Sequence, residues 1–111
     1  PLDAGGADSI ADVADAQLYY RRALVENPKL TAAMFNLAII VTPSDPAQAM
    51  DLYRQAIAIE PDMAPAHLNL GLLLRANGQT ALGDAEVARA LALDPSLASR
   101  ASAALPSGST S

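Results

Sequence analysis

Apolar residues recur at steps of three and four along most of the chain, which is the period of a helix face and not the period of two that marks a strand. The clearest pattern is a small, large, small triplet that occurs three times: Ala16-Tyr20-Ala23, Ala49-Tyr53-Ala56 and Gly83-Val87-Ala90. Each triplet is followed by a proline that a helix cannot continue through. These prolines are Pro28, Pro61 and Pro95, at spacings of 33 and 34 residues. A period of this length predicts repeated helical hairpins.

A further helix is predicted before two of the three triplets. Residues 33–38 read Ala-Met-Phe-Asn-Leu-Ala, and residues 66–71 read Ala-His-Leu-Asn-Leu-Gly at an offset of 33. Each of these repeats therefore pairs a first helix with a second helix. The first triplet lacks such a partner, because residues 1–8 are short and contain Gly5-Gly6. We expect its helix to expose an apolar edge that includes Ile10, Val13 and Tyr20.

Local signals predict where several helices begin and end. Ser9, with Asp12 three residues later, resembles a capping box and places the first helix at about 9–26. Asp45 followed by Pro46 predicts an N-cap and first turn for a helix that runs to about residue 59. Asn77-Gly78 predicts a helix end, since glycine adopts the left-handed conformation without steric penalty.

The signature residues of one repeat resemble the tetratricopeptide family in order and spacing: Asn69, Leu70, Gly71, Leu74, Gly78, Val87, Ala90 and Pro95. The resemblance covers about residues 12–95. It implies an all-α fold, an α-solenoid of antiparallel helical hairpins with about two and a half repeats and a short C-terminal helix. Related helical-hairpin families with similar packing are the alternative.

This interpretation divides the chain into a flexible segment 1–8, a repeat domain 9–105 and a flexible tail 106–111. The domain comprises a half repeat 9–28, repeats 29–61 and 62–95, and a capping helix 96–105. Two departures from the family pattern stand out. The turn Thr42–Pro46 is one residue short and lacks glycine, so it is expected to be tight, and Gly83 replaces the usual alanine, which would allow closer packing.

Composition narrows the function classes. The net charge is −5, and the basic residues are scattered singly apart from Arg21-Arg22, which disfavours nucleic acids and anionic membrane surfaces as partners. No apolar run approaches the ~20 residues that span a bilayer, and the N-terminus does not resemble a signal peptide. The absence of cysteine excludes disulfides but leaves the compartment open, with the cytoplasm slightly favoured.

Catalytic chemistry is not predicted. His67 is the only histidine and occupies a packing position, so a core or boundary role is expected, and no metal partners stand at ligand spacing. The sequence has no phosphate-binding glycine loop, nucleophile elbow or cysteine nucleophile. We expect neither an enzyme nor a cofactor or metal site.

In the resembled family the first helix of each hairpin lines a concave groove that binds a peptide. Helical spacing places Phe35, Ile39 and Thr42 in one row, with Leu68, Leu72 and Arg75 as the equivalent row. We expect an exposed apolar groove rimmed by Arg75; the alternative is that these residues are core shared by adjacent hairpins.

Asn36 and Asn69 repeat beside these rows. An amide there can clip the backbone of an extended peptide, because it donates and accepts at once, or it can bridge neighbouring helices. Both roles stay open. In the chaperone-binding members of the resembled family, lysine and arginine around such asparagines clamp a terminal carboxylate. Here Phe35, Ile39 and Pro65 stand where those cations would be needed, so a chaperone tail is not the expected ligand.

The leading hypothesis is a protein-interaction module that binds an apolar helix or an extended peptide in this groove. The first alternative is self-association, a homo-oligomer formed through the exposed repeat ends. The second is a regulatory appendage of a larger enzyme, as similar repeats are in some glycosyltransferases.

Overall fold

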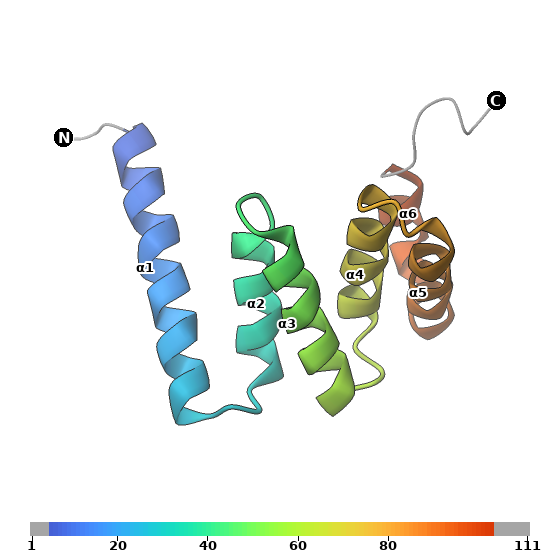
Figure 1. Cartoon of the computed structure of the whole chain (residues 1–111), viewed down its shortest axis with the longest axis horizontal. Helices are drawn as coiled ribbons and strands as arrows, with labels where there is room; N and C mark the ends of the chain where they lie inside the picture. The colour runs from blue at the N-terminus through green and yellow to red at the C-terminus, as the bar shows by residue number, and fades with distance from the viewer. Residues whose placement is uncertain (1–4, 104–111) are drawn as a thin grey trace. The chain divides into compact units, whose positions relative to one another are not determined.

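The computed structural model describes residues 5–103, and the side chains of residues 12–102. All regular structure in that range is helical (Figure 1), which confirms the all-α helical-repeat fold. The elements are α1 (Gly5–Glu26), α2 (Thr31–Val41), α3 (Pro46–Ile59), α4 (Ala64–Ala76), α5 (Thr80–Leu93), a 3₁₀ turn (Pro95–Leu97) and α6 (Ala98–Ala103). None of these described helices is long and apolar enough to cross a membrane.

The chain forms two compact units, Pro1–Ile59 and Glu60–Ser111. The first unit contains α1, α2 and α3, and the second contains α4, α5 and α6. Each unit holds one complete hairpin, α2–α3 or α4–α5, together with one extra helix.

The core of the first unit lies between α2 and α3. Helix α2 buries one apolar row in this core: Met34, Leu37, Ala38 and Val41. Helix α3 presents its whole triplet to this row, and Ala49, Tyr53 and Ala56 are almost completely buried. The small residues let the two backbones approach, and the tyrosine fills the space beside them.

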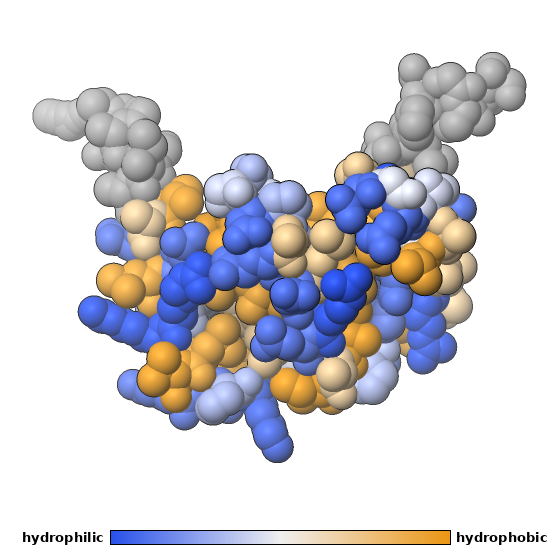
Figure 2. Space-filling view, viewed as in Figure 1, coloured by the Kyte–Doolittle hydropathy of each residue, from blue (hydrophilic) through white to orange (hydrophobic). Residues whose placement is uncertain are grey.

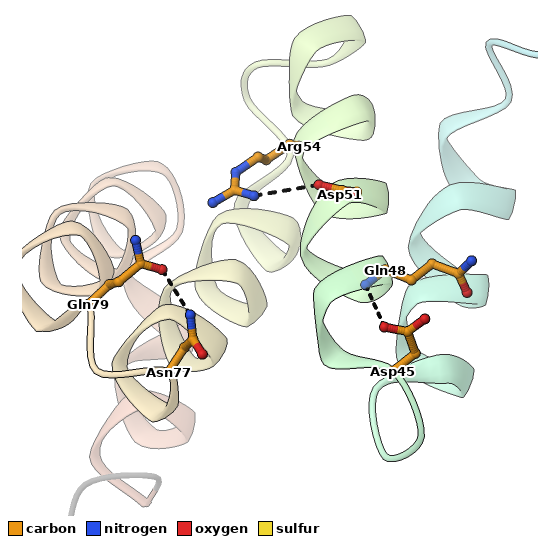
Figure 3. Close-up of polar contacts among 6 residues, drawn as sticks. All are labelled: Asp45, Gln48, Asp51, Arg54, Asn77 and Gln79. Carbon is orange, nitrogen blue, oxygen red and sulfur yellow. Dashed lines mark hydrogen bonds and ion pairs between the residues drawn. The ribbon is translucent and has the colours of Figure 1, made fainter.

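The α2–α3 turn is held by hydrogen bonds at both of its ends. The Val41 carbonyl accepts bonds from the amides of Ser44 and Asp45, at 3.1 and 2.7 Å. The Asp45 carboxylate then accepts the Gln48 amide at 3.1 Å (Figure 3). This bond satisfies an amide that the first turn of α3 would otherwise leave unpaired, and it confirms Asp45 as the N-cap.

Helix α1 begins at Gly5, earlier than the predicted start at Ser9. The helix therefore overlaps the predicted segment 1–8 at residues 5–8, and residues 1–4 lie outside the described range. Glycine lowers helix propensity by about 1 kcal/mol but does not forbid the helical conformation, so Gly5-Gly6 is not a sufficient stop signal. The polar pair Ser9 and Asp12 lies within the helix instead of capping it.

The second hairpin is packed more closely than side chains would permit, because two glycines face each other. A Cβ atom placed on Gly71 of α4 would lie 2.8 Å from the Gly83 carbonyl oxygen. A Cβ on Gly83 of α5 would lie 2.6 Å from the Gly71 carbonyl oxygen. This contact bears out the expectation that Gly83 allows closer packing.

A left-handed glycine ends α4, as the sequence predicts. Gly78 has φ of 85°, and its amide donates to the Arg75 carbonyl at 3.0 Å. The Gln79 amide reaches back to the Leu74 carbonyl at 2.8 Å, which completes a Schellman motif. The Asn77 side chain also donates to Gln79 Oε1 at 3.1 Å (Figure 3).

The C-terminal capping segment consists of a 3₁₀ turn and a short helix within the described residues. The Asp94 carboxylate accepts the Ser96 amide at 3.0 Å and starts the 3₁₀ turn, after which α6 covers Ala98–Ala103. Ala101 is buried against the core of the second unit, and Leu97 packs beside it. Residues 104–111, which include the predicted tail, lie outside the described range.

Candidate functional site

The predicted row on α2 is partly open to solvent. Ile39 is 47% exposed, whereas Phe35 is half-buried and packs its ring edge-to-face on Tyr53 of α3, with centroids 5.7 Å apart. Thr42 is half-buried, and its hydroxyl donates to the Ala38 carbonyl at 2.7 Å. Phe35 and Ile39 therefore offer apolar surface, while the Thr42 hydroxyl is already used by its own helix.

Asn36 lies next to this row and is half-buried. Among the described residues, no hydrogen bond or ion pair involves its amide group. We define Phe35, Asn36 and Ile39 as the α2 strip. It combines two apolar side chains with one amide that can both donate and accept.

The equivalent row on α4 is largely closed. Leu68 is 0% exposed and belongs to a cluster with Val87, Ala90 and Ala101. The exposure expected for Leu68 is therefore wrong, and the alternative of a core position is the correct one for this residue. The Leu68 side chain packs against Val87 and Ala90 of α5, and Ala101 of α6 covers the rest of it.

The two other residues of the α4 row are also engaged. Leu72 is half-buried and packs against the same cluster. Arg75 donates from Nε to Asp84 Oδ1 of α5 at 2.7 Å, so its guanidinium is paired across the hairpin and does not stand free as a rim residue.

Asn69 differs from its counterpart Asn36. Arg100 of α6 donates from Nη2 to Asn69 Oδ1 at 2.9 Å. In this unit the repeated asparagine therefore bridges two helices, one of the two roles that the sequence leaves open.

His67 is buried, as expected for a packing position. Its Nδ1 lies 2.6 Å from Glu86 Oε1 of α5, and its Nε2 lies 2.7 Å from the Pro61 carbonyl oxygen. Both ring nitrogens therefore have an oxygen atom as partner, which fixes the ring between α5 and the Pro61 carbonyl. Within residues 12–102 no three His, Cys, Asp or Glu side chains gather as metal ligands.

The structure also reveals apolar surface on α1 that sequence reasoning named only in part. Val13 of the predicted edge is 53% exposed and Tyr20 is half-buried, while the side chain of Ile10 lies outside the described range. Three exposed residues of α1 were not predicted: Leu18, Tyr19 and Val25. The seven-residue spacing of Leu18 and Val25, which places them on one helix face, was the available signal.

No family model and no curated protein sequence matches the chain. Among solved structures, the fold matches the crystal structure of MamA, a tetratricopeptide-like protein, with a TM-score of 0.71 and 21% sequence identity. The match covers 82% of this chain and 54% of the MamA chain, so this chain spans about half the length of that structure. The likeness supports a tetratricopeptide-like fold, in agreement with the signature residues.

Proposed function

We propose that the chain is a protein-interaction module whose α2 strip binds an apolar helix or an extended peptide. The observation that carries this proposal is the coexistence of exposed Ile39, half-buried Phe35 and the unpaired amide of Asn36 on one stretch of helix. Apolar anchors supply affinity on leaving water, and an amide beside them can pair with a peptide backbone.

The α4 row offers less binding surface of its own. Leu68 lies in the core of the second unit, Leu72 and Asn69 are half-buried, and Arg75 is held by its ion pair. The proposed site therefore centres on α2, with Thr42 at its end, and not equally on both first helices.

A binding role is favoured over catalysis by the state of the only histidine. Both ring nitrogens of His67 are occupied by Glu86 and the Pro61 carbonyl, and the side chain is buried. A general base must reach a substrate proton, which this geometry does not permit without breaking a buried contact.

The test is selection of peptides from a phage-displayed random library against the whole chain, followed by fluorescence-anisotropy titration of the selected peptides. The Ile39→Asp variant should weaken binding by on the order of tenfold to a hundredfold, because it places a charge among apolar contacts. The matched control is Leu82→Asp, which makes the same change at a 56% exposed leucine of α5.

Helical circular dichroism should be unchanged in both variants. Equal affinity of the wild-type chain and Ile39→Asp for every selected peptide, or an equal loss in Leu82→Asp, would show that the α2 strip is not the binding site.

A further inference from the structure

The turn between α4 and α5 contains an asparagine that precedes a glycine. An asparagine side chain can be attacked by the backbone nitrogen of the next residue, and a glycine nitrogen is the least hindered because glycine has no Cβ. The other asparagines of the chain are followed by proline, whose nitrogen has no hydrogen to lose, or by leucine, which crowds the approach. They are Asn27, Asn36 and Asn69. The sequence therefore singles out Asn77 for this reaction.

The Asn77-Gly78 pair is open to water. Residues 76–80 are all exposed, and a Cβ placed on Gly78 would meet nothing within 4 Å. In the view of Figure 1, hydrophilic residues gather over the end of the second hairpin where this turn lies (Figure 2). Hydroxide and water, the reagents of the reaction, can therefore reach both residues.

The fold nevertheless holds the two reacting groups apart. Asn77 has ψ of 7°, which places the Gly78 nitrogen beside the Asn77 nitrogen and turned away from the side-chain carbon. To close a five-membered ring, the Gly78 nitrogen must rotate about the Cα–C bond of Asn77 until it faces that carbon. This rotation breaks the hydrogen bond from the Gly78 amide to the Arg75 carbonyl, which is 3.0 Å long.

Two further contacts hold the same geometry. Asn77 Nδ2, the group that must leave, donates to Gln79 Oε1 at 3.1 Å (Figure 3). The Gln79 amide donates to the Leu74 carbonyl at 2.8 Å, which fixes the chain beyond Gly78. All of these bonds belong to the last turn of α4 and the residues directly after it. The reaction therefore requires opening of this turn and not unfolding of the whole chain.

We propose that Asn77 is a site of spontaneous deamidation and that transient opening of the α4–α5 turn sets its rate. In the open turn, hydroxide removes the Gly78 amide proton and the nitrogen attacks Cγ of Asn77. The N–Cγ bond forms, the Cγ–Nδ2 bond breaks, and ammonia leaves with a proton taken from water. One molecule of water then opens the cyclic imide at either carbonyl and yields aspartate or isoaspartate.

Both products disturb the turn. Each places a carboxylate at the C-terminal end of α4, where the helix dipole disfavours negative charge. Isoaspartate also adds one carbon atom to the main chain within the Schellman motif. Since Gly71 and Gly83 leave no room for even a Cβ atom, α5 cannot shift along α4 to absorb the extra length without a clash. Deamidation should therefore loosen the second hairpin, an effect that goes beyond the proposed function because it does not involve the α2 strip.

The experiment is incubation of the whole chain at mildly alkaline pH, followed over time by liquid chromatography and mass spectrometry of its proteolytic peptides. A synthetic peptide of residues 73–82 is the unfolded reference. Deamidation should accumulate at Asn77, with isoaspartate among the products, and should be on the order of tenfold or more slower than in the synthetic peptide. Asn36 and Asn69, measured in the same samples, should stay intact.

Two changes of a single methyl group separate opening of the turn from loss of stability elsewhere. Gly83→Ala adds a methyl group between α4 and α5 and should raise the deamidation rate of Asn77 on the order of tenfold, because it strains the hairpin that holds the turn. The matched control is Ala49→Gly, which removes a methyl group from the first hairpin and should leave the rate unchanged.

An intact Asn77 under conditions that convert the synthetic peptide would overturn the proposal. Equal rates in the chain and the peptide, or a rate that Gly83→Ala leaves unchanged, would also overturn it, because the turn would then not control the reaction. Equal acceleration by Gly83→Ala and Ala49→Gly would assign the reaction to global unfolding instead.

Discussion

The two hairpins follow one repeat pattern but are packed by different means. In α2–α3, Ala38 and Ala49 occupy the equivalent positions and are both 0% exposed, and Tyr53 is buried on the same face as Ala49. In α4–α5 the equivalent positions are Gly71 and Gly83, whose backbones meet directly. The repeat pattern therefore specifies which positions of the paired helices face each other. The distance between the two helices is set by the size of the residues at those positions.

The difference extends to the surfaces of the first helices. The α2 strip keeps an exposed isoleucine and an unpaired amide, whereas α4 has its leucine sealed and its asparagine bonded to Arg100. Helix α6 contributes to this contrast, because its Ala101 packs against Leu68 and its Arg100 bonds to Asn69. In the first unit α1 packs against α2, yet Ile39 stays 47% exposed. We therefore propose the α2 strip, and not the α4 row, as the binding surface.

The largest expected effect comes from comparing buried Leu68 of α4 with exposed Ile39 of α2. Leu68→Ala should lower the free energy of unfolding by about 3 kcal/mol, because it leaves a cavity among Val87, Ala90 and Ala101. Ile39→Ala should cost less than about 1 kcal/mol, since its side chain is 47% exposed. Urea denaturation followed by circular dichroism measures both. Equal losses in the two variants would contradict the contrast between the first helices.

A second comparison concerns the closest contact of each hairpin. Gly83→Ala should destabilise the chain by about 2 kcal/mol, since the new methyl group would press on the Gly71 carbonyl and outweigh the gain in helix propensity. Ala49→Gly, at the equivalent position of α3, should cost about 1 kcal/mol through lost propensity and contact. Stabilisation by Gly83→Ala in urea denaturation would show that α4 and α5 can separate without cost.

The smallest expected effect concerns the first-helix position that holds Met34 in one hairpin and His67 in the other. His67→Met should lower stability by about 1–2 kcal/mol, because the Pro61 carbonyl and Glu86 each lose their polar contact with the ring while the packing volume is kept. Met34→Leu is the control and should cost under about 1 kcal/mol. Unchanged stability of His67→Met in thermal and urea unfolding would mean that the two contacts of the ring contribute nothing net.

Local chemistry made the helix boundaries predictable. Asp45-Pro46 and Asn77-Gly78 carry their own signals, a side-chain acceptor for free amides and a residue that tolerates positive φ, so the starts and ends they mark agree with the structure. At Ser9 the signal was weaker, because a helix can run through a capping residue when nothing forces it to stop.

Which helix faces are buried was less predictable, because burial depends on segments that are distant in the sequence. Leu68 is one residue from the row that contacts the second helix, a rotation of about 100°. Whether the Leu68 side chain is exposed to solvent depends on α6, which lies some thirty residues away in the sequence. The small side chains of α6 gave no indication that it covers another helix. Arg100 and its bond to Asn69 were missed for the same reason.

The meeting of Gly71 and Gly83 has a consequence for how the second hairpin moves. Contacts between side chains can slide from one rotamer to another, but main-chain atoms have no rotamers to exchange. Because the backbones at Gly71 and Gly83 leave no room for even a Cβ atom, main-chain atoms fix the spacing of α4 and α5, and a force applied to α4 is transmitted directly to α5. Helices α4 and α5 should thus move as one rigid body, and their backbone amides should show similarly slow hydrogen exchange in both helices.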